Sequence, residues 1–131
     1  MTRVVDELVE NALRELADEQ QQRRLWTATE GPEVSSFDEC LSRLWDDSGL
    51  GVALEKAGKV FDDEIDDHLR RLDCTLRGVD SMRPVDLLLV DPRLVEAREL
   101  ARHLLDELRR FGRDAATSSL AWIFRDRDCL A

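Results

Sequence analysis

The longest amphipathic stretch of the chain repeats its apolar residues at intervals of mostly three and four from Leu54 to Leu76. This spacing, which passes through Ile65, is the period of an α-helix that buries one face. Gly78 stands just after the last apolar residue, where helices commonly end. We therefore expect a helix over residues 52–77, and an all-α fold built around it.

The same period, or the signals of helix ends, marks the other elements. Ser36 and Glu39 have the spacing of a capping box, in which each side chain satisfies a free backbone N–H. Asp91 and Pro92 place an N-cap carboxylate before a proline at the first helical position. Gly112 marks the end of the helix that Pro92 begins. The expected helices cover residues 3–26, 36–47, 52–77, 92–111 and 115–125.

Two segments fit more than one structure. The apolar run at 84–90 could be a buried strand, but its length and the flanking prolines favour a short helix. Residues 115–125 suit a helix or a strand, and we favour the helix. A chain of 131 residues with 43% hydrophobic residues can bury one core. Residues 1–131 are therefore expected to form a single-domain bundle of about five helices with a short apolar helix near 84–90.

Charge is distributed unevenly along the chain. Up to Asp73 there are 19 acidic and 9 basic residues, and from Cys74 onward there are ten of each, so the formal excess of −10 lies in the first 73 residues. Such a half repels polyanions and attracts basic surfaces. Two lysines against seventeen arginines are typical of a GC-rich bacterial genome.

Six aspartates stand out within the acidic half as a candidate patch for a basic partner. Four of them fall within six residues, where they repel one another and are poor helix formers, so keeping them suggests that they face a partner. They are not a calcium loop, because carboxylates do not alternate around a central glycine. The other reading is a solvated face balanced by nearby basic residues. The patch comprises Asp46, Asp47, Asp62, Asp63, Asp66 and Asp67.

A Glu-x-x-x-His pattern occurs twice, at Glu64/His68 and again at Glu99/His103. Two such helices side by side could offer carboxylates and imidazoles to a metal. However, helical phase places His68 near the centre of its apolar face with Glu64 at the rim, and places His103 toward solvent. We therefore expect the two histidines not to face one core and to form no shared metal site. His68 and Glu64 remain a possible pocket, and no cofactor is predicted.

Catalytic and redox motifs are lacking in the sequence. Cys40, Cys74 and Cys129 are odd in number and widely spaced, which fits neither a disulfide framework nor a zinc knuckle. On one helix, Cys74 would point away from His68, and Cys40 is expected to pack as a small apolar residue. No nucleophile elbow or phosphate-binding loop occurs. The sequence therefore predicts a protein that is not an enzyme.

Neither nucleic acid nor a membrane is an expected partner. The arginines of residues 93–113 alternate with glutamates and aspartates, which is typical of a solvated, salt-bridged face rather than a phosphate track. No apolar run approaches the ~20 residues of a membrane span, and the N-terminus lacks the apolar segment of a signal peptide. We expect a cytoplasmic protein.

The function expected from these features is the binding of a basic protein partner. An immunity protein or antitoxin, a chaperone and a regulatory adaptor all fit this description. The alternative is a small-molecule or metal-binding bundle with His68 in an interior pocket. A homodimer is also possible, because Trp26, Trp45 and Trp122 are large and the first helix extends beyond its apolar stripe.

Overall fold

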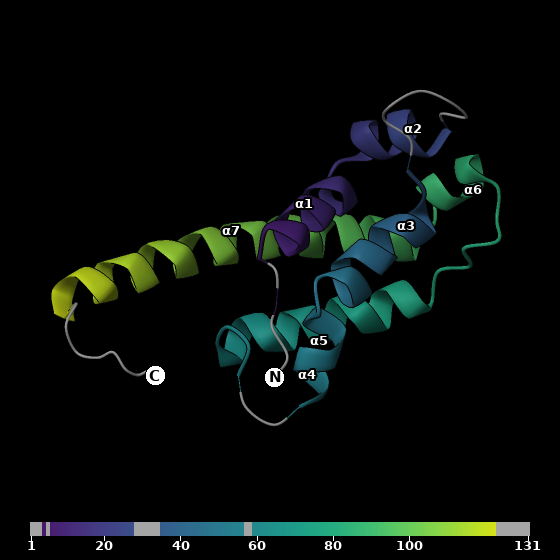
Figure 1. Ribbon diagram of the computed structural model, residues 1–131. Helices are drawn as coiled ribbons and strands as arrows, with labels where there is room; N and C mark the ends of the chain where they lie inside the picture. Colours follow the sequence, from purple (N-terminus) through teal and green to yellow (C-terminus); the bar gives the residue numbers. More distant parts are fainter. Residues whose placement is uncertain (1–3, 5, 28–34, 57–58, 123–131) are drawn as a thin grey trace.

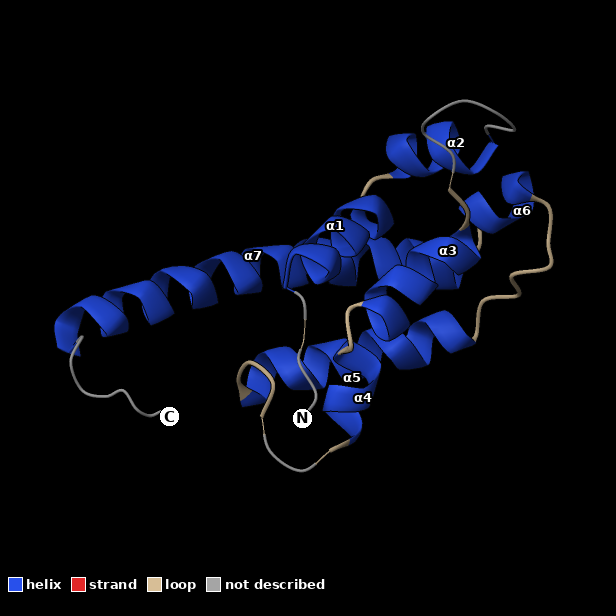
Figure 2. Cartoon of the chain, in the orientation of Figure 1, coloured by secondary structure: helices blue, strands red, loops and turns tan. Residues whose placement is uncertain are grey.

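The computed structural model describes residues 4, 6–27, 35–56 and 59–122, with side chains described up to residue 112. Within these ranges every regular element is a helix (Figures 1 and 2), which confirms the predicted all-α class. The elements are α1 (Asp6–Ala17), α2 (Glu19–Thr27), α3 (Phe37–Leu41), the π-helical turn η1 (Ser42–Asp47), α4 (Leu50–Glu55), α5 (Asp63–Arg77), α6 (Val85–Leu89) and α7 (Pro92–Trp122). None of these helices is long and apolar enough to cross a membrane.

Helix α7 is the element against which the bundle is built. It packs against α1 and α5, and its C-terminal half continues past them (Figure 1). Its buried face presents Leu94, Ala97, Ala101 and Leu104, all fully buried, at helical spacing. The buried leucines of α1 and α5 join the same core. The core therefore lies between α1, α5 and the first half of α7.

The predicted helix over residues 3–26 is in fact two helices separated at Asp18. The Gln22 amide donates to the carbonyls of Glu15 (3.1 Å) and Leu16 (2.7 Å), which lie in the last turn of α1. Asp18 accepts a hydrogen bond from the backbone N–H of Gln21 (3.1 Å) and so caps α2. The break occurs because side chains satisfy the backbone groups of both new helix ends.

The predicted helix over residues 52–77 is also divided, into α4 and α5. Helix α4 begins at Leu50, directly after Gly49, whose φ of 82° lies in the left-handed region that glycine adopts readily. It ends at Glu55, and Lys56 is extended. Helix α5 begins after Asp62, whose carboxylate accepts the N–H of Ile65 (2.7 Å) as its N-cap.

Gly78 ends α5 as predicted, but not through a left-handed conformation. Its φ of −82° is right-handed, and a side chain there would meet the Arg93 side chain at 2.6 Å. Arg93 uses this space to donate to the Gly78 carbonyl at 2.8 Å. Close approach of another side chain therefore explains this glycine.

The predicted helices 92–111 and 115–125 are one continuous helix, α7, as far as Trp122. Gly112 lies inside it, and a Cβ at this position would meet nothing within 4 Å. A single glycine costs a helix only about 1 kcal/mol, which the residues on either side offset. Residues 123–125 of the second prediction lie outside the described residues. The predictions at 36–47 and 84–90 are confirmed as α3 with η1 and as α6.

A buried polar pair holds α2 against α7. Arg98 is 5% exposed and donates to the Gln22 side-chain oxygen (2.9 Å) and to the Leu89 carbonyl (2.7 Å). Burial lowers the pKa of Arg98, and the Glu19 carboxylate opposes this effect. The Gln22 amide therefore connects the break after α1 to α7, and Arg98 extends this connection to α6.

We expect Gln22→Leu to reduce the free energy of unfolding by about 2–4 kcal/mol. The substitution leaves the Arg98 guanidinium and two carbonyls without their buried partner, at about 1–3 kcal/mol for each unsatisfied group. Urea unfolding followed by circular dichroism measures the change. The same substitution at the exposed Gln20 is the control and should shift stability by no more than about 0.5 kcal/mol. Equal effects at both positions would contradict this role of Gln22.

Candidate functional site

The six predicted patch aspartates do not share one role. Asp46 and Asp47 are exposed on η1, and Asp63 and Asp67 are exposed on α5. Asp62 is the N-cap of α5, and Asp66 is buried. Two of the exposed members form long ion pairs at the surface: Asp63 Oδ2 lies 3.6 Å from Lys59 Nζ, and Asp67 Oδ1 lies 3.5 Å from Arg70 Nη1. Four of the six therefore remain available to a partner.

Asp66 is a structural residue and not part of an exposed patch. It is 2% exposed, and its two carboxylate oxygens accept the backbone N–H groups of Val60 (2.8 Å) and Phe61 (3.0 Å). These bonds hold the segment before α5 against the first turn of that helix. The sequence pattern could not separate Asp66 from its neighbours, because the groups that it binds are backbone amides.

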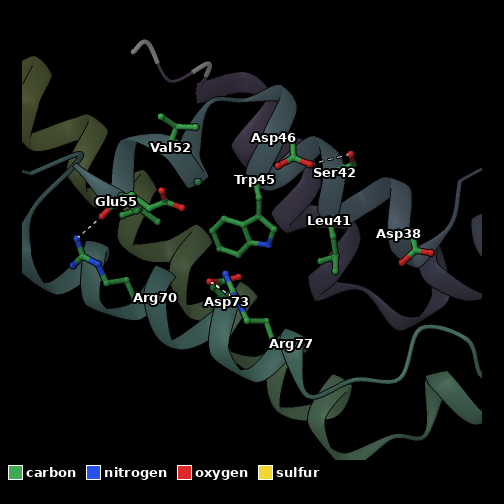
Figure 3. A pocket seen from close by; sticks show the side chains of 12 residues that line it. Asp38, Leu41, Ser42, Trp45, Asp46, Val52, Glu55, Arg70, Asp73 and Arg77 are labelled. Atoms are coloured by element: carbon green, nitrogen blue, oxygen red, sulfur yellow. Dashed lines mark hydrogen bonds and ion pairs between the residues drawn. The ribbon is translucent and has the colours of Figure 1, made fainter. Parts of the chain in front are cut away.

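A cleft of about 550 Å³ opens between η1, α3 and α4 on one side and α5 on the other. Figure 3 shows the Trp45 indole in the middle of the cleft, with Arg70, Asp73 and Arg77 projecting from α5. The remaining lining residues are Asp38 and Leu41 of α3, Ser42 and Asp46 of η1, and Gly51, Val52, Leu54 and Glu55 of α4. The cleft brings together residues that are up to 39 positions apart in the sequence.

Gly51 allows α4 to lie directly against Trp45. A Cβ at this position would stand 3.0 Å from the Trp45 carbonyl oxygen and 3.6 Å from its Cβ. The preceding left-handed residue, Gly49, turns the chain from η1 into α4. The two glycines thereby set the width of the cleft at Trp45, whose side chain is half-buried.

The cleft carries four carboxylates and two guanidinium groups, a formal excess of two negative charges. Arg77 is bonded to Asp73 (3.1 Å), and this hydrogen bond raises the pKa of Arg77. Arg70 donates to the Leu54 carbonyl at 3.2 Å. Both arginines thus bond groups within the fold, and the carboxylates of the cleft outnumber them two to one.

Three of those carboxylates form no ion pair among the described residues. Asp38 and Glu55 contact no cation there, although the charge of Glu55 acts on Arg77 at longer range, and Asp46 accepts the Ser42 hydroxyl at 3.4 Å. Asp47 follows on the same turn and is exposed. Part of the excess negative charge of the first half of the chain therefore lies beside Trp45.

The predicted pocket around His68 has a different composition from the one expected. Glu64 is exposed, whereas His68 lies beside Glu107 of α7, with its Nδ1 2.8 and 2.9 Å from the two carboxylate oxygens. His103 also lies near Glu107, with its Nε2 3.7 Å from Oε2. The centroids of the two imidazole rings are 5.1 Å apart.

Helical phase predicted that His103 lies toward solvent, and this is confirmed, but it did not predict that the two imidazole rings lie close together. His103 does face largely outward, since its side chain is 54% exposed, but it lies at the edge of the α5–α7 contact. A side chain at such an edge can be exposed and still touch the neighbouring helix. Glu107 was missed because it reads as one of several solvated acids, yet its position four residues after His103 was a signal for this group.

A second buried acid was also missed from sequence. Glu15 of α1 is 2% exposed and accepts hydrogen bonds from Trp26 Nε1 (2.7 Å), Ser35 Oγ (2.8 Å) and Arg43 (3.1 Å). Trp26 also packs edge-on against Phe37, with ring centroids 5.8 Å apart. This arrangement fixes α2 and the start of α3 on α1, and it places Trp26 in the core.

Cysteine chemistry finds no support at Cys40. The thiol is fully buried and lies 3.5 Å from the Ala12 carbonyl. Burial, followed by the negative charge of Glu15, raises the pKa of Cys40 well above its usual range. Since the thiolate is the nucleophile, Cys40 packs as an apolar residue, as the sequence predicts. Cys74 is exposed on α5, and Cys129 lies outside the described residues.

The comparisons with known proteins leave this geometry as the main evidence on function. The sequence matches no protein-family model, and neither a curated protein nor a solved structure is detectably similar to the chain.

We expect Asp66→Ala to lower the free energy of unfolding by about 1–3 kcal/mol, because the N–H groups of Val60 and Phe61 lose their acceptor. Asp67→Ala, one residue away and exposed, should change it by no more than about 0.5 kcal/mol. Urea unfolding of both variants measures the difference. If Asp67→Ala were as destabilising as Asp66→Ala, the assignment of a structural role to Asp66 alone would be wrong.

We expect iodoacetamide to modify Cys74 in the folded protein while Cys40 stays unmodified. Cys74 is exposed, whereas Cys40 is buried and its raised pKa suppresses the reactive thiolate. Mass spectrometry of peptides after timed labelling measures the two rates, and labelling in urea shows that both sites can react. Rapid modification of Cys40 without denaturant would refute this reading.

Proposed function

We propose that the protein binds a basic segment of a protein partner in the Trp45 cleft. The observation that carries this proposal is the half-buried Trp45 beside Asp38, Asp46 and Glu55, carboxylates that form no ion pair among the described residues. Tryptophan is the side chain most favourable for a cation above its ring, and it is common in the centre of binding sites. An arginine or lysine of the partner can lie on the indole while neighbouring basic residues meet the carboxylates.

The shape and charge of the cleft favour a polypeptide over a small molecule. Small-molecule sites are predominantly apolar, with a few placed polar groups. Here six of the twelve lining residues are ionisable. A cleft with charged walls and one aromatic centre suits an extended basic segment, and the net charge of −10 would speed its encounter at low salt.

The chemistry of the cleft specifies a basic partner, and several classes of protein have such a partner. An inhibitor that covers the site of a basic toxin, a chaperone for a basic client and an adaptor all use such a surface. In all three cases we propose that the protein acts in the cytoplasm and is not a catalyst. Homodimerisation stays a separate prediction. Trp26 no longer supports it, because this residue is in the core, and the Trp122 side chain lies outside the described residues.

We expect the combined variant Asp38→Asn/Asp46→Asn/Glu55→Gln to bind the partner about tenfold more weakly or worse, a loss of about 1.4 kcal/mol. It should also show a smaller dependence of affinity on salt, because fewer ion pairs form. The measurement is quantitative capture at low salt from cells of the native host, followed by pairwise titration of the captured protein across a salt series.

A matched control neutralises three exposed carboxylates elsewhere, Glu7→Gln/Asp86→Asn/Asp106→Asn, and changes the net charge equally. We expect this control variant to bind the partner with unchanged affinity. Loss of binding in both variants would show that overall charge, and not the cleft, attracts the partner. Unchanged binding in both variants would show that the carboxylates of the cleft do not bind the partner.

A further inference from the structure

The two histidines of the chain lie in one cluster, although 34 residues separate them in the sequence. His68 comes from α5, and His103 and Glu107 come from successive turns of α7. One nitrogen from each ring and one Glu107 oxygen all lie within 4.8 Å of one another. Every imidazole that this protein possesses is thus concentrated at one point of the α5–α7 contact.

These distances suit a metal ion with small adjustments. In a tetrahedral zinc site with bonds of about 2.0–2.1 Å, neighbouring ligand atoms are roughly 3.3 Å apart. Glu107 Oε1 lies 2.8 Å from His68 Nδ1, and Glu107 Oε2 lies 3.7 Å from His103 Nε2, so one distance is shorter and the other longer than this value. The two histidine side chains are partly exposed and stand on different helices, so rotation about their side-chain bonds can bring the three atoms to a common distance.

The chemistry of the three groups selects the class of metal. Two imidazoles and one carboxylate suit zinc and other first-row divalent ions, whereas calcium and magnesium prefer all-oxygen sites. Glu107 is 4% exposed, and its carboxylate lies within 4 Å of a nitrogen of each ring. A buried carboxylate is costly unless it is paired, and a divalent cation would pair it more strongly than the imidazoles do.

The cluster is open to solvent on one side. His103 is more than half exposed. Glu107 also lines a small cleft of about 180 Å³ with Asp62, Glu64 and Arg110. The acidic side chains of this cleft attract cations. The Glu107 carboxylate, which is one of them, also contacts the two histidines. An ion can therefore reach the site without opening the core.

We propose that His68, His103 and Glu107 bind one divalent transition-metal ion of the Zn²⁺ class, with a coordination position left to water. This inference concerns a different site from the Trp45 cleft and does not depend on the partner. The bound ion would connect α5 to α7 directly. Since binding to the folded state alone stabilises that state, zinc should raise the midpoint of thermal unfolding.

The test is a titration of the full-length chain, without a histidine tag, by isothermal calorimetry with Zn²⁺. We expect one equivalent to bind. Loss of a second-shell partner costs roughly 10–100-fold in metal affinity, so loss of a direct ligand in His103→Ala or Glu107→Gln should cost at least about 100-fold. His103→Ala changes an exposed side chain and should stay folded, which circular dichroism can verify.

Two controls make the result decisive. Glu99→Gln makes the same carboxylate-to-amide change four residues before His103, at an exposed residue outside the cluster, and should leave affinity unchanged. A Cys74→Ser/Cys129→Ser variant removes the exposed Cys74 thiol together with the Cys129 thiol and should also bind normally. The absence of any one-equivalent binding would overturn the proposal. So would binding that survives His103→Ala and Glu107→Gln but disappears with the cysteines.

Discussion

Helix α7 packs on α1 and α5 through a face in which two alanines lie between two leucines, and this contact determines the positions of the other elements. Ala97 and Ala101 are fully buried between Leu94 and Leu104. Small side chains at these positions let neighbouring helices approach closely, while the leucines supply most of the buried apolar area, at about 25 cal/mol per Å². Helix α5 reaches its position in the Trp45 cleft and beside His103 because it is held on this face.

Buried polar groups then fix the segments that the apolar core leaves undetermined. Glu15 attaches α2 and α3 to α1, Gln22 with Arg98 attaches α2 to α6 and α7, and Asp66 holds the segment before α5. In each case the side chain bonds groups that are distant in sequence or belong to a non-helical backbone. Such groups are costly to leave unpaired, so each one selects a single arrangement of otherwise similar short helices.

Apolar periodicity predicted the helical class and most of the core, since Ile65, Leu69, Leu72 and Leu76 are buried as their spacing indicates. It failed at the breaks near Asp18 and between α4 and α5. There, the hydrogen bonds that the Gln22 amide donates and the Asp66 carboxylate accepts determine the path of the chain, and apolar periodicity does not predict them. Periodicity could not predict the contact between the histidines for a similar reason. Helical phase gives the direction in which a side chain leaves its own helix, whereas the contact between His68 and His103 depends on the position of α5 relative to α7.

Helix α5 carries one wall of the cleft and one member of the histidine cluster on opposite sides. At about 100° per residue, Arg70, Asp73 and Arg77 lie roughly 140–200° around the helix from His68. A substitution at either place therefore changes neither the contacts nor the local charge of the other. What the two places share is the attachment of α5 to the core, through Leu69 and Leu72, which are fully buried between them. A change that loosened this attachment would disturb both at once, whereas a change on one exposed face of α5 reports on that face alone.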